Sequence, residues 1–304
     1  MNIAVSGSHG FIGSALVGSL PAAGHRVTPL VRGRSSVEGG IAWNAEAAYV
    51  DTAKLEAIDA VVHLAGEPIP GRWTPRKKAR ILESRVKGTR LIAEAISHLA
   101  KPPQVFVCAS AIGYYGDRGE EILREESPSG GGFLAQVCRE WEAATEPAAK
   151  KGIRVVNLRT GIVLGAGGGA LAKMLTPFRM GVGGRIGSGR QYMSWIALDD
   201  LVGVVHHVLN TASLRGPVNA VAPDPVTNAE FTKTLGRVLS RPTIFPLPAF
   251  VVKLAFGQMG EEALLGSQRV EPARLQASGY KFRSPELEGT LRRAAGKGGS
   301  SNKG

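Results

Sequence analysis

The amino-terminal stretch constrains the fold most, because it joins an apolar strand to a helix through closely spaced glycines. Residues 2–6 form a short apolar run. Gly7, Gly10 and Gly13 follow at three-residue spacing, and a helical pattern begins with them. Such a junction directs unpaired N–H groups and the positive end of the helix dipole at one point, which suits a pyrophosphate. A plain strand-to-helix turn is the alternative, since the chain contains 40 glycines.

The position of this turn at the start of the chain, directly after an apolar strand, favours dinucleotide binding. Gly7 permits the turn, Gly10 allows the backbone to approach the phosphates, and Gly13 allows the helix to pack closely on the strand. The predicted cofactor contacts in this loop are Gly7, Ser8, Gly10, Phe11, Ile12 and Gly13.

The end of the second predicted strand bears on the choice of cofactor. Residues 26–31 form that strand, and Arg-Gly-Arg-Ser-Ser follows at 32–36 without a carboxylate. At this place in dinucleotide folds an acidic residue binds a free ribose 2′-hydroxyl, whereas arginine suits a 2′-phosphate. We therefore predict that Arg32, Arg34 and Ser35 hold NADP(H) in preference to NAD(H); a basic surface loop is the alternative.

Strands and helices alternate along the first half of the chain. Strand-like runs lie at 59–66, 104–109 and 154–159, and helical patterns at 74–99 and 133–144. This alternation predicts an α/β fold with a Rossmann-type, doubly wound parallel sheet, whose ligands lie along the carboxyl ends of the strands. The run at 59–66 ends in small residues, so Leu64, Ala65 and Gly66 are predicted to form a wall of the cofactor site.

The texture of the sequence changes after residue 163, where glycine-rich stretches and shorter helical patterns begin. These features predict a smaller C-terminal cap domain that contacts the substrate. The predicted division is an NADP-binding domain at 1–163 to which 195–222 return, a cap at 164–194 and 223–293, and a disordered tail at 294–304.

The formal net charge of +12 is partly concentrated in residues 72–90. A basic patch of this kind is able to attract nucleic acid. Because no nucleic-acid module and no interleaved aromatic residues accompany it, we expect a solvated helix face with a few cationic contacts to a phosphorylated cofactor. Nucleic acid is not an expected partner.

The two cysteines, Cys108 and Cys138, are not spaced as metal ligands, so we expect buried, reduced thiols and no metal. No apolar stretch approaches the ~20 residues of a membrane-spanning helix. A structural strand starts at residue 2, so no secretory signal is expected there. These features predict a cytoplasmic protein without membrane contact.

Several motifs together give the chain its family resemblance. It resembles the extended short-chain dehydrogenase/reductase superfamily over residues 1–293, and within it an epimerase-like branch formerly described as nucleoside-diphosphate-sugar epimerases or cell division inhibitors. The motifs are Gly7-x-x-Gly10-x-x-Gly13, His63-Leu-Ala-Gly-Glu67, Ser84-Arg-Val-x-Gly-Thr89, Ser110-Ala-Ile-Gly-Tyr-Tyr115, Trp141-Glu-Ala-Ala144, Arg159-Thr-Gly-Ile-Val-Leu-Gly165, Ile186-Gly-Ser-Gly-x-Gln191, Trp195-Ile196 and Leu264-Leu-Gly-x-Gln-Arg-Val270 through Gly279-Tyr280. The resemblance implies NADP(H) as cofactor and, besides the loop and wall residues above, contacts from Arg85 and Val163.

One departure from the superfamily pattern concerns proton transfer. Its enzymes use a Tyr-x-x-x-Lys pair, in which the lysine lowers the pKa of the tyrosine. None of the five tyrosines here is followed four residues later by lysine, and the helix expected to carry the pair has Phe133 and Val137 instead. The candidates that remain at the mouth of the sheet are Ser110, Tyr114, Tyr115 and Glu67. Of these, Ser110 and Tyr115 are the predicted catalytic residues, although each also fits a purely structural role. Arg185 and Arg190 are candidates to hold an anionic substrate, with mobile loop arginines as the alternative.

Two classes of function follow from this combination. The first is an NADP(H)-dependent, epimerase-like oxidoreductase that acts on an unidentified small carbonyl or sugar-like substrate. The second is a non-catalytic protein that senses the NADPH/NADP⁺ ratio, favoured by the missing Tyr-Lys pair. The sequence does not indicate an oligomeric state.

Overall fold

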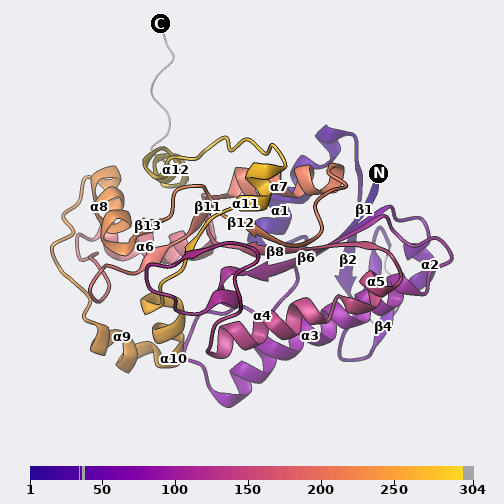
Figure 1. The fold of residues 1–304 in the computed structure, drawn as a ribbon, viewed down its shortest axis with the longest axis horizontal. Coiled ribbons are helices and arrows are strands. Elements are labelled where there is room, and N and C mark those ends of the chain that lie inside the picture. The colour runs from indigo at the N-terminus through magenta and orange to yellow at the C-terminus, as the bar shows by residue number, and fades with distance from the viewer. Residues whose placement is uncertain (34, 36–37, 297–304) are drawn as a thin grey trace, which may run out of the picture.

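The computed structural model describes residues 1–33, 35 and 38–296. Eight strands form one sheet in the order β12-β8-β6-β5-β1-β2-β3-β4 (Figure 1). Neighbouring strands are parallel except for β3 and β4. The strands are β1 Asn2–Ser6, β2 Arg26–Arg32, β3 Ile41–Asn44, β4 Tyr49–Val50, β5 Ala60–His63, β6 Val105–Ala111, β8 Arg154–Thr160 and β12 Gly216–Ala220. The strand order reverses direction at β1, where doubly wound sheets bind their ligands.

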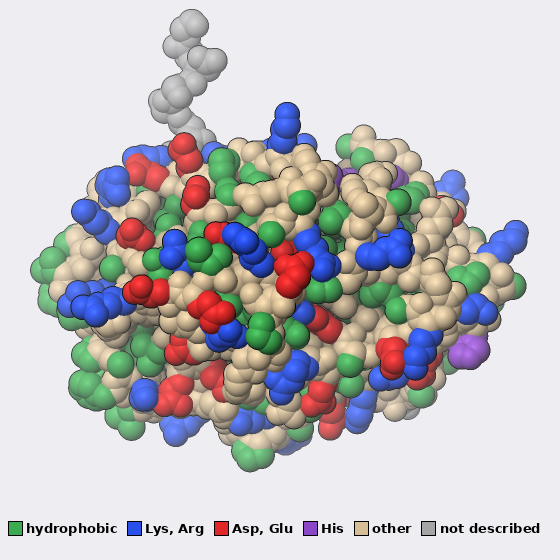
Figure 2. Space-filling model, in the orientation of Figure 1, with side chains coloured by type: hydrophobic (Ala, Val, Ile, Leu, Met, Phe, Trp, Pro, Cys, Tyr) green, Lys and Arg blue, Asp and Glu red, His purple; other side chains and the backbone are tan. Residues whose placement is uncertain are grey.

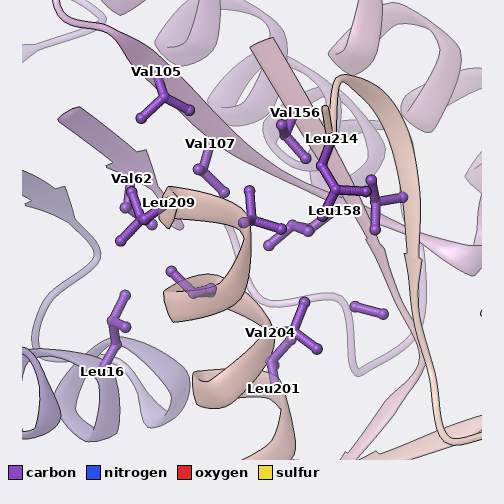
Figure 3. Packing of buried hydrophobic residues seen from close by; sticks show 14 of the residues in the cluster. Leu16, Val62, Val105, Val107, Val156, Leu158, Leu201, Val204, Leu209 and Leu214 are labelled. Carbon is purple, nitrogen blue, oxygen red and sulfur yellow. The ribbon is translucent and has the colours of Figure 1, made fainter. Parts of the chain in front are cut away.

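Helices cover both faces of this sheet. On one face lie α1 (Phe11–Ser19), α7 (Leu198–Asn210) and the short α11 (Ala273–Ala277); on the other lie α3 (Pro75–Ser97), α4 (Phe133–Ala143) and α5 (Glu146–Lys150) (Figure 1). Figure 3 shows the first interface, where Leu16 of α1 and Leu201 and Val204 of α7 face valines of the strands. Near-continuous apolar strands of this kind are typical of a sheet buried on both faces.

The remaining elements gather beyond one end of the sheet, on the left in Figure 1. Helices α6 (Gly169–Arg179), α8 (Asn228–Leu239) and α12 (Leu287–Ala294) share an apolar core with Trp195 and Phe231. Three two-stranded pairs extend this part: β9 (Ile162–Leu164) with β11 (Trp195–Ala197), β10 (Tyr192–Met193) with β13 (Val226–Thr227), and β7 (Ile122–Leu123) with β14 (Arg269–Val270). Helices α9 (Ala249–Phe256) and α10 (Gln258–Gly260) precede a π-helical turn, Glu261–Leu265.

Side-chain caps fix where two of the longer helices begin. Thr74 accepts a hydrogen bond from the backbone N–H of Lys77, and Pro75 occupies the first position of α3. Thr227 and Glu230 form a reciprocal capping box at the start of α8. These groups satisfy N–H donors that have no partner within a helix, a contribution of about 1 kcal/mol for each cap.

The predicted α/β fold with a doubly wound parallel sheet is confirmed, as are its strands at the predicted positions. Helix α1 ends at Ser19, and a 3₁₀ turn (Pro21–Ala23) follows. The predicted disordered tail starts too early, because Ala294 ends α12; residues 297–304 lie outside the described residues. The division into two domains stays a prediction.

The basic stretch at 72–90 is not a uniform patch. Lys77 and Arg80 pair with Glu67, Lys87 pairs with Glu83, and Arg85 is buried. On the face seen in Figure 2 cationic and anionic side chains are interspersed. Within the described ranges, none of the helices combines the length and the apolar character needed to cross a membrane.

Candidate functional site

The glycine loop between β1 and α1 has the geometry of an anion-binding turn. Gly7 has a φ of +67°, and Gly10 donates a hydrogen bond to its carbonyl oxygen at 2.9 Å. A Cβ added to Gly13 would lie 2.0 Å from that same oxygen, so the position admits only glycine. No side chain caps the start of α1, which leaves its first N–H groups available to a ligand.

The surroundings of the loop leave room over this helix end. An open hollow of about 550 Å³ reaches Gly10, Phe11 and Gly167. The Phe11 ring packs under the segment that precedes α6: a Cβ on Gly168 would lie 2.4 Å from it. Ser8 is buried beside His9, and Ile12 packs on the core below the sheet edge.

Beside the loop, at the carboxyl end of β2, lies the predicted phosphate-binding segment. Arg32 is exposed, and its guanidinium makes no hydrogen bond or ion pair to a described residue. Ser35 is exposed too, whereas the predicted contact Arg34 lies outside the described residues. An unpaired guanidinium next to the glycine loop is free to bind a ligand phosphate.

The predicted wall at the end of β5 is organised by Ser6 of the neighbouring strand. The Ser6 hydroxyl lies 2.6 Å from His63 Nδ1 and accepts hydrogen bonds from the N–H groups of Leu64 and Ala65. Burial lowers the pKa of His63 to about 3, so this side chain stays neutral. It is an oriented core histidine, and its Nε2 has no hydrogen-bond partner among the described residues.

A cavity of about 220 Å³ opens at the carboxyl ends of β6 and β8. Its lining includes Ala111, residues 160–162, residues 262–264, Gly266 and Gln268. The walls are mainly apolar and include Ile69, Ile112, Leu134, Val137, Trp141 and Met193. Apolar cavities with a few polar groups at the carboxyl edge of such a sheet are typical ligand sites.

Arg85 of α3 lies in the wall of this cavity and is 9% exposed. Its Nη1 donates to the carbonyl oxygens of Glu67 (2.9 Å) and Ile81 (3.2 Å), and its guanidinium lies 5.0 Å from the Trp141 ring centroid. Burial lowers its pKa. The predicted contact Val163 lies on β9, half-buried against the core beneath the sheet.

Ser110 and Tyr115, the predicted catalytic residues, do not line the cavity. Ser110 donates a 2.7 Å hydrogen bond to Glu142. The Tyr115 side chain is 0% exposed, and its hydroxyl donates to Asn219 (2.7 Å) and accepts from Arg159 (3.0 Å). Burial raises the pKa of Tyr115 to about 12. Both hydroxyls therefore serve an internal network.

The centre of that network is a buried ion pair. Arg159 of β8 donates to both carboxylate oxygens of Glu142 on α4, each at 2.8 Å, and it is 3% exposed as a side chain. Its guanidinium also lies 3.4 Å from the centroid of the Tyr114 ring. The two side chains tie the sheet to the helix that packs against it.

Three charged residues considered from the sequence lie away from the cavity. The Glu67 carboxylate accepts a 2.8 Å hydrogen bond from Lys77. This hydrogen bond lowers the pKa of the Glu67 carboxyl, because its effect exceeds that of the partial desolvation, which raises the pKa. Arg185 and Arg190 are exposed, and neither lines the cavity.

Two polar residues in the cavity wall were not predicted as site residues. The Glu262 carboxylate accepts hydrogen bonds from the N–H groups of Phe133 (2.9 Å) and Leu134 (2.8 Å) and so caps α4 from the C-terminal part of the chain. Tyr192 lines the cavity, and its hydroxyl makes no hydrogen bond to a described residue. Glu262 and Tyr192 lie far from α4 in the sequence, so no local pattern predicts that they line the cavity beside that helix.

Two family models match the chain. The NAD dependent epimerase/dehydratase family covers residues 3–220, and a domain of unknown function, DUF1731, covers residues 247–294. The epimerase family protein MT2273 of Mycobacterium tuberculosis is 43% identical over 281 residues, which cover 92% of this chain and 93% of that protein. The human epimerase family protein SDR39U1 is 40% identical over 296 residues, 96% of this chain and 99% of that protein.

A solved structure is similar over the same length. The crystal structure of human SDR39U1 (isoform 2) with NADPH has a TM-score of 0.87 and 38% identity, and the match covers 97% of this chain and 99% of that one. The motif-based resemblance is confirmed: the chain belongs to the NAD dependent epimerase/dehydratase family of extended short-chain dehydrogenases/reductases.

Proposed function

We propose that this protein binds NADP(H) and uses it to reduce or oxidise a small carbonyl or alcohol substrate in the cavity beside α4. The observation that carries the proposal is the loop at Gly7–Gly13, where an added side chain at Gly13 would collide with the loop backbone and no side chain caps the helix end that faces a ligand. The relative crystallised with NADPH supports the choice of cofactor.

The residues around the loop fit such a cofactor. The free N–H groups at the start of α1 would hold the diphosphate, and Leu64, Ala65 and Gly66 would lie against a ribose. Arg32, with Ser35 and Arg34 beside it in the sequence, would bind the 2′-phosphate. Val163 extends the same edge of the sheet. When bound, NADPH supplies a hydride to a carbonyl carbon, whose oxygen takes up a proton to become the alcohol.

The source of that proton is proposed anew, because Ser110 and Tyr115 are held in the Glu142–Arg159 network. Among the described tyrosines, Tyr192 lines the cavity and has an uncommitted hydroxyl. We assign it as the proton donor, with no lysine to assist it. Both thiols are free and buried, which supports the cytoplasmic location expected from the sequence.

A non-catalytic NADPH sensor is the second candidate, favoured by the fully buried Tyr115 and by the apolar α4 face at Val137 where the superfamily places its catalytic pair. A sensor would bind NADPH without consuming it on any substrate. Consumption of NADPH with a carbonyl probe, followed by absorbance, at a rate that Tyr192→Phe lowers at least tenfold, supports the enzyme. Tight binding of NADPH without its consumption on any member of a broad carbonyl panel supports the sensor.

The cofactor assignment is tested by titrating NADPH and NADH into Arg32→Ala. Loss of a hydrogen bond between charged groups costs about 1.5–3 kcal/mol, so NADPH binding is expected to weaken about 10- to 100-fold while NADH binding changes little. Arg26→Ala is the matched control, because Arg26 is exposed at the opposite end of the same strand. Equal losses for NADPH and NADH would overturn the phosphate assignment.

A further inference from the structure

The cavity beside α4 is lined by one cationic side chain, Arg85, which forms no direct ion pair with a described residue and feels the Glu67 carboxylate only at longer range. No described carboxylate lies within ion-pair distance of it; Glu67 contacts it through its backbone carbonyl and gives its carboxylate to Lys77 and Arg80. A charge buried in an apolar environment is costly unless it is paired. Arg85 therefore has the properties of a group whose partner is a ligand.

The hydrogen bonds of Arg85 leave half of its guanidinium available. Both of its bonds to described residues run through Nη1, so Nε and Nη2 are left to a ligand. These two nitrogens form one edge of the planar fork, which matches a carboxylate in a bidentate arrangement. The other charged group in the wall, Glu262, already accepts hydrogen bonds from two backbone N–H groups and from the Gln258 amide.

The size and lining of the cavity limit what else the ligand contains. A volume of about 220 Å³ lies below the ~300–1,000 Å³ usual for sites that hold drug-sized molecules. Ile69, Leu134, Val137, Trp141 and Met193 offer apolar contacts, and Arg85 is the single cation among the lining residues. A nucleotide sugar needs more room, more polar partners for its hydroxyls and more positive charge for its diphosphate.

We infer that the substrate is a small, largely apolar carbonyl compound, or the matching alcohol, that bears one carboxylate, and that Arg85 binds this carboxylate. The inference rests on the proposed function and names its substrate class. It also moves Arg85 from the cofactor, where the family resemblance placed it, to the substrate. In the reducing direction the hydride adds to the carbonyl carbon, the proton goes to the carbonyl oxygen, and the carboxylate stays unchanged on Arg85.

The test compares an oxo acid with the ketone in which a methyl group replaces the carboxylate, and with a nucleotide sugar. The full-length protein is given NADPH with 4-methyl-2-oxopentanoate or with the neutral ketone 4-methyl-2-pentanone, and kcat/KM is measured from NADPH absorbance. In a separate reaction it is given NADP⁺ with UDP-glucose, and conversion is measured by chromatography of the nucleotide sugars, because epimerisation causes no net change in NADPH. Binding of the oxo acid to the NADP⁺-loaded protein is measured in parallel by calorimetry. We expect the oxo acid to exceed the matched ketone about tenfold or more, and no turnover of UDP-glucose.

Variants at Arg85 assign the preference to that side chain. Arg85→Met should abolish the preference for the acid and leave the Kd of NADPH within about twofold, whereas Arg85→Lys should keep part of the preference. Three results would overturn the inference. They are an equal kcat/KM for the oxo acid and the ketone in the unaltered protein, turnover of UDP-glucose, and a loss of NADPH affinity in Arg85→Met as large as its loss of affinity for the oxo acid. Failure of the unaltered protein to bind NADPH would instead refute the proposed function, and the comparison of probes needs no variant to fold.

Discussion

Replacing Glu142 by Gln removes the charge from the buried pair that joins α4 to β8. The carboxylate accepts three hydrogen bonds, from Arg159 Nε, Arg159 Nη2 and the Ser110 hydroxyl. Glutamine keeps one oxygen acceptor but turns an N–H group toward a donor, and Arg159 stays buried without a counter-charge. Breaking a buried pair in this way costs about 3–5 kcal/mol. Because the Glu142 side chain is 13% exposed, we expect the lower end, about 3 kcal/mol.

Urea unfolding, followed by tryptophan fluorescence, measures this loss as a lower midpoint at an unchanged slope. Glu140→Gln is the control on the same helix, because the Glu140 carboxylate accepts a hydrogen bond from Gln136 and pairs with no cation among the described residues, and its effect should stay within about 0.5 kcal/mol. Adding Arg159→Met to Glu142→Gln should cost less than the sum of the single changes, since the double variant no longer buries a lone cation. A Glu142→Gln protein as stable as the unaltered one would refute this account of the network.

The remaining predictions concern the glycine loop and the core histidine. Gly13→Ala places a Cβ 2.0 Å from the Gly7 carbonyl oxygen, so we expect a loss of about 1–3 kcal/mol of stability and loss of NADPH binding in calorimetry. Gly18→Ala is the control, because Gly18 lies in the same helix with open space around it; this variant should fold normally and bind NADPH. Equal stability and equal NADPH binding of the two variants would contradict the geometry. The pKa of His63 falls from about 6.5 in the unfolded chain to about 3 in the fold, so the unfolded state binds the proton first and stability declines as pH falls below 6.5. Between pH 7 and pH 5 the unaltered protein should lose about 2 kcal/mol of unfolding free energy that His63→Asn does not lose; parallel urea curves for both proteins at the two pH values would show the histidine to be uninvolved.

The parts of the molecule that were predictable from the sequence are those set by local pattern. Apolar runs predict strands of the sheet because both of its faces are buried, and Gly7, Gly10 and Gly13 predict the turn because each position has a steric reason to lack a side chain. Thr74 followed by Pro75 similarly marks the start of α3, one residue from the predicted position.

The internal network was not predictable, because its members come from four separate segments. The Tyr115 hydroxyl meets Asn219, which lies 104 residues later, and Arg159 meets Glu142 across the space between sheet and helix. From the sequence alone, a tyrosine that follows the end of a strand is equally consistent with a catalytic residue and with a core residue. Only its zero exposure and its two committed hydrogen bonds favour the second interpretation.

The cavity could not be predicted from the sequence for a related reason. Its wall combines α3, α4 and residues 262–268, which are brought together by folding, so the sequence showed Arg85 in mid-helix but not that it lacks a carboxylate partner. Tyr192 likewise lies in a short strand whose polar neighbours give no local sign of a site.

The central claim is that the turn between β1 and α1 holds a nicotinamide nucleotide with a 2′-phosphate. Isothermal titration of NADPH into the full-length protein tests it directly, with NADH titrated under the same conditions. The account predicts saturable binding of one NADPH per chain, at least about tenfold tighter than NADH, in line with one charge-assisted phosphate contact. Absence of measurable heat with NADPH at any accessible concentration, or tighter binding of NADH, would contradict it.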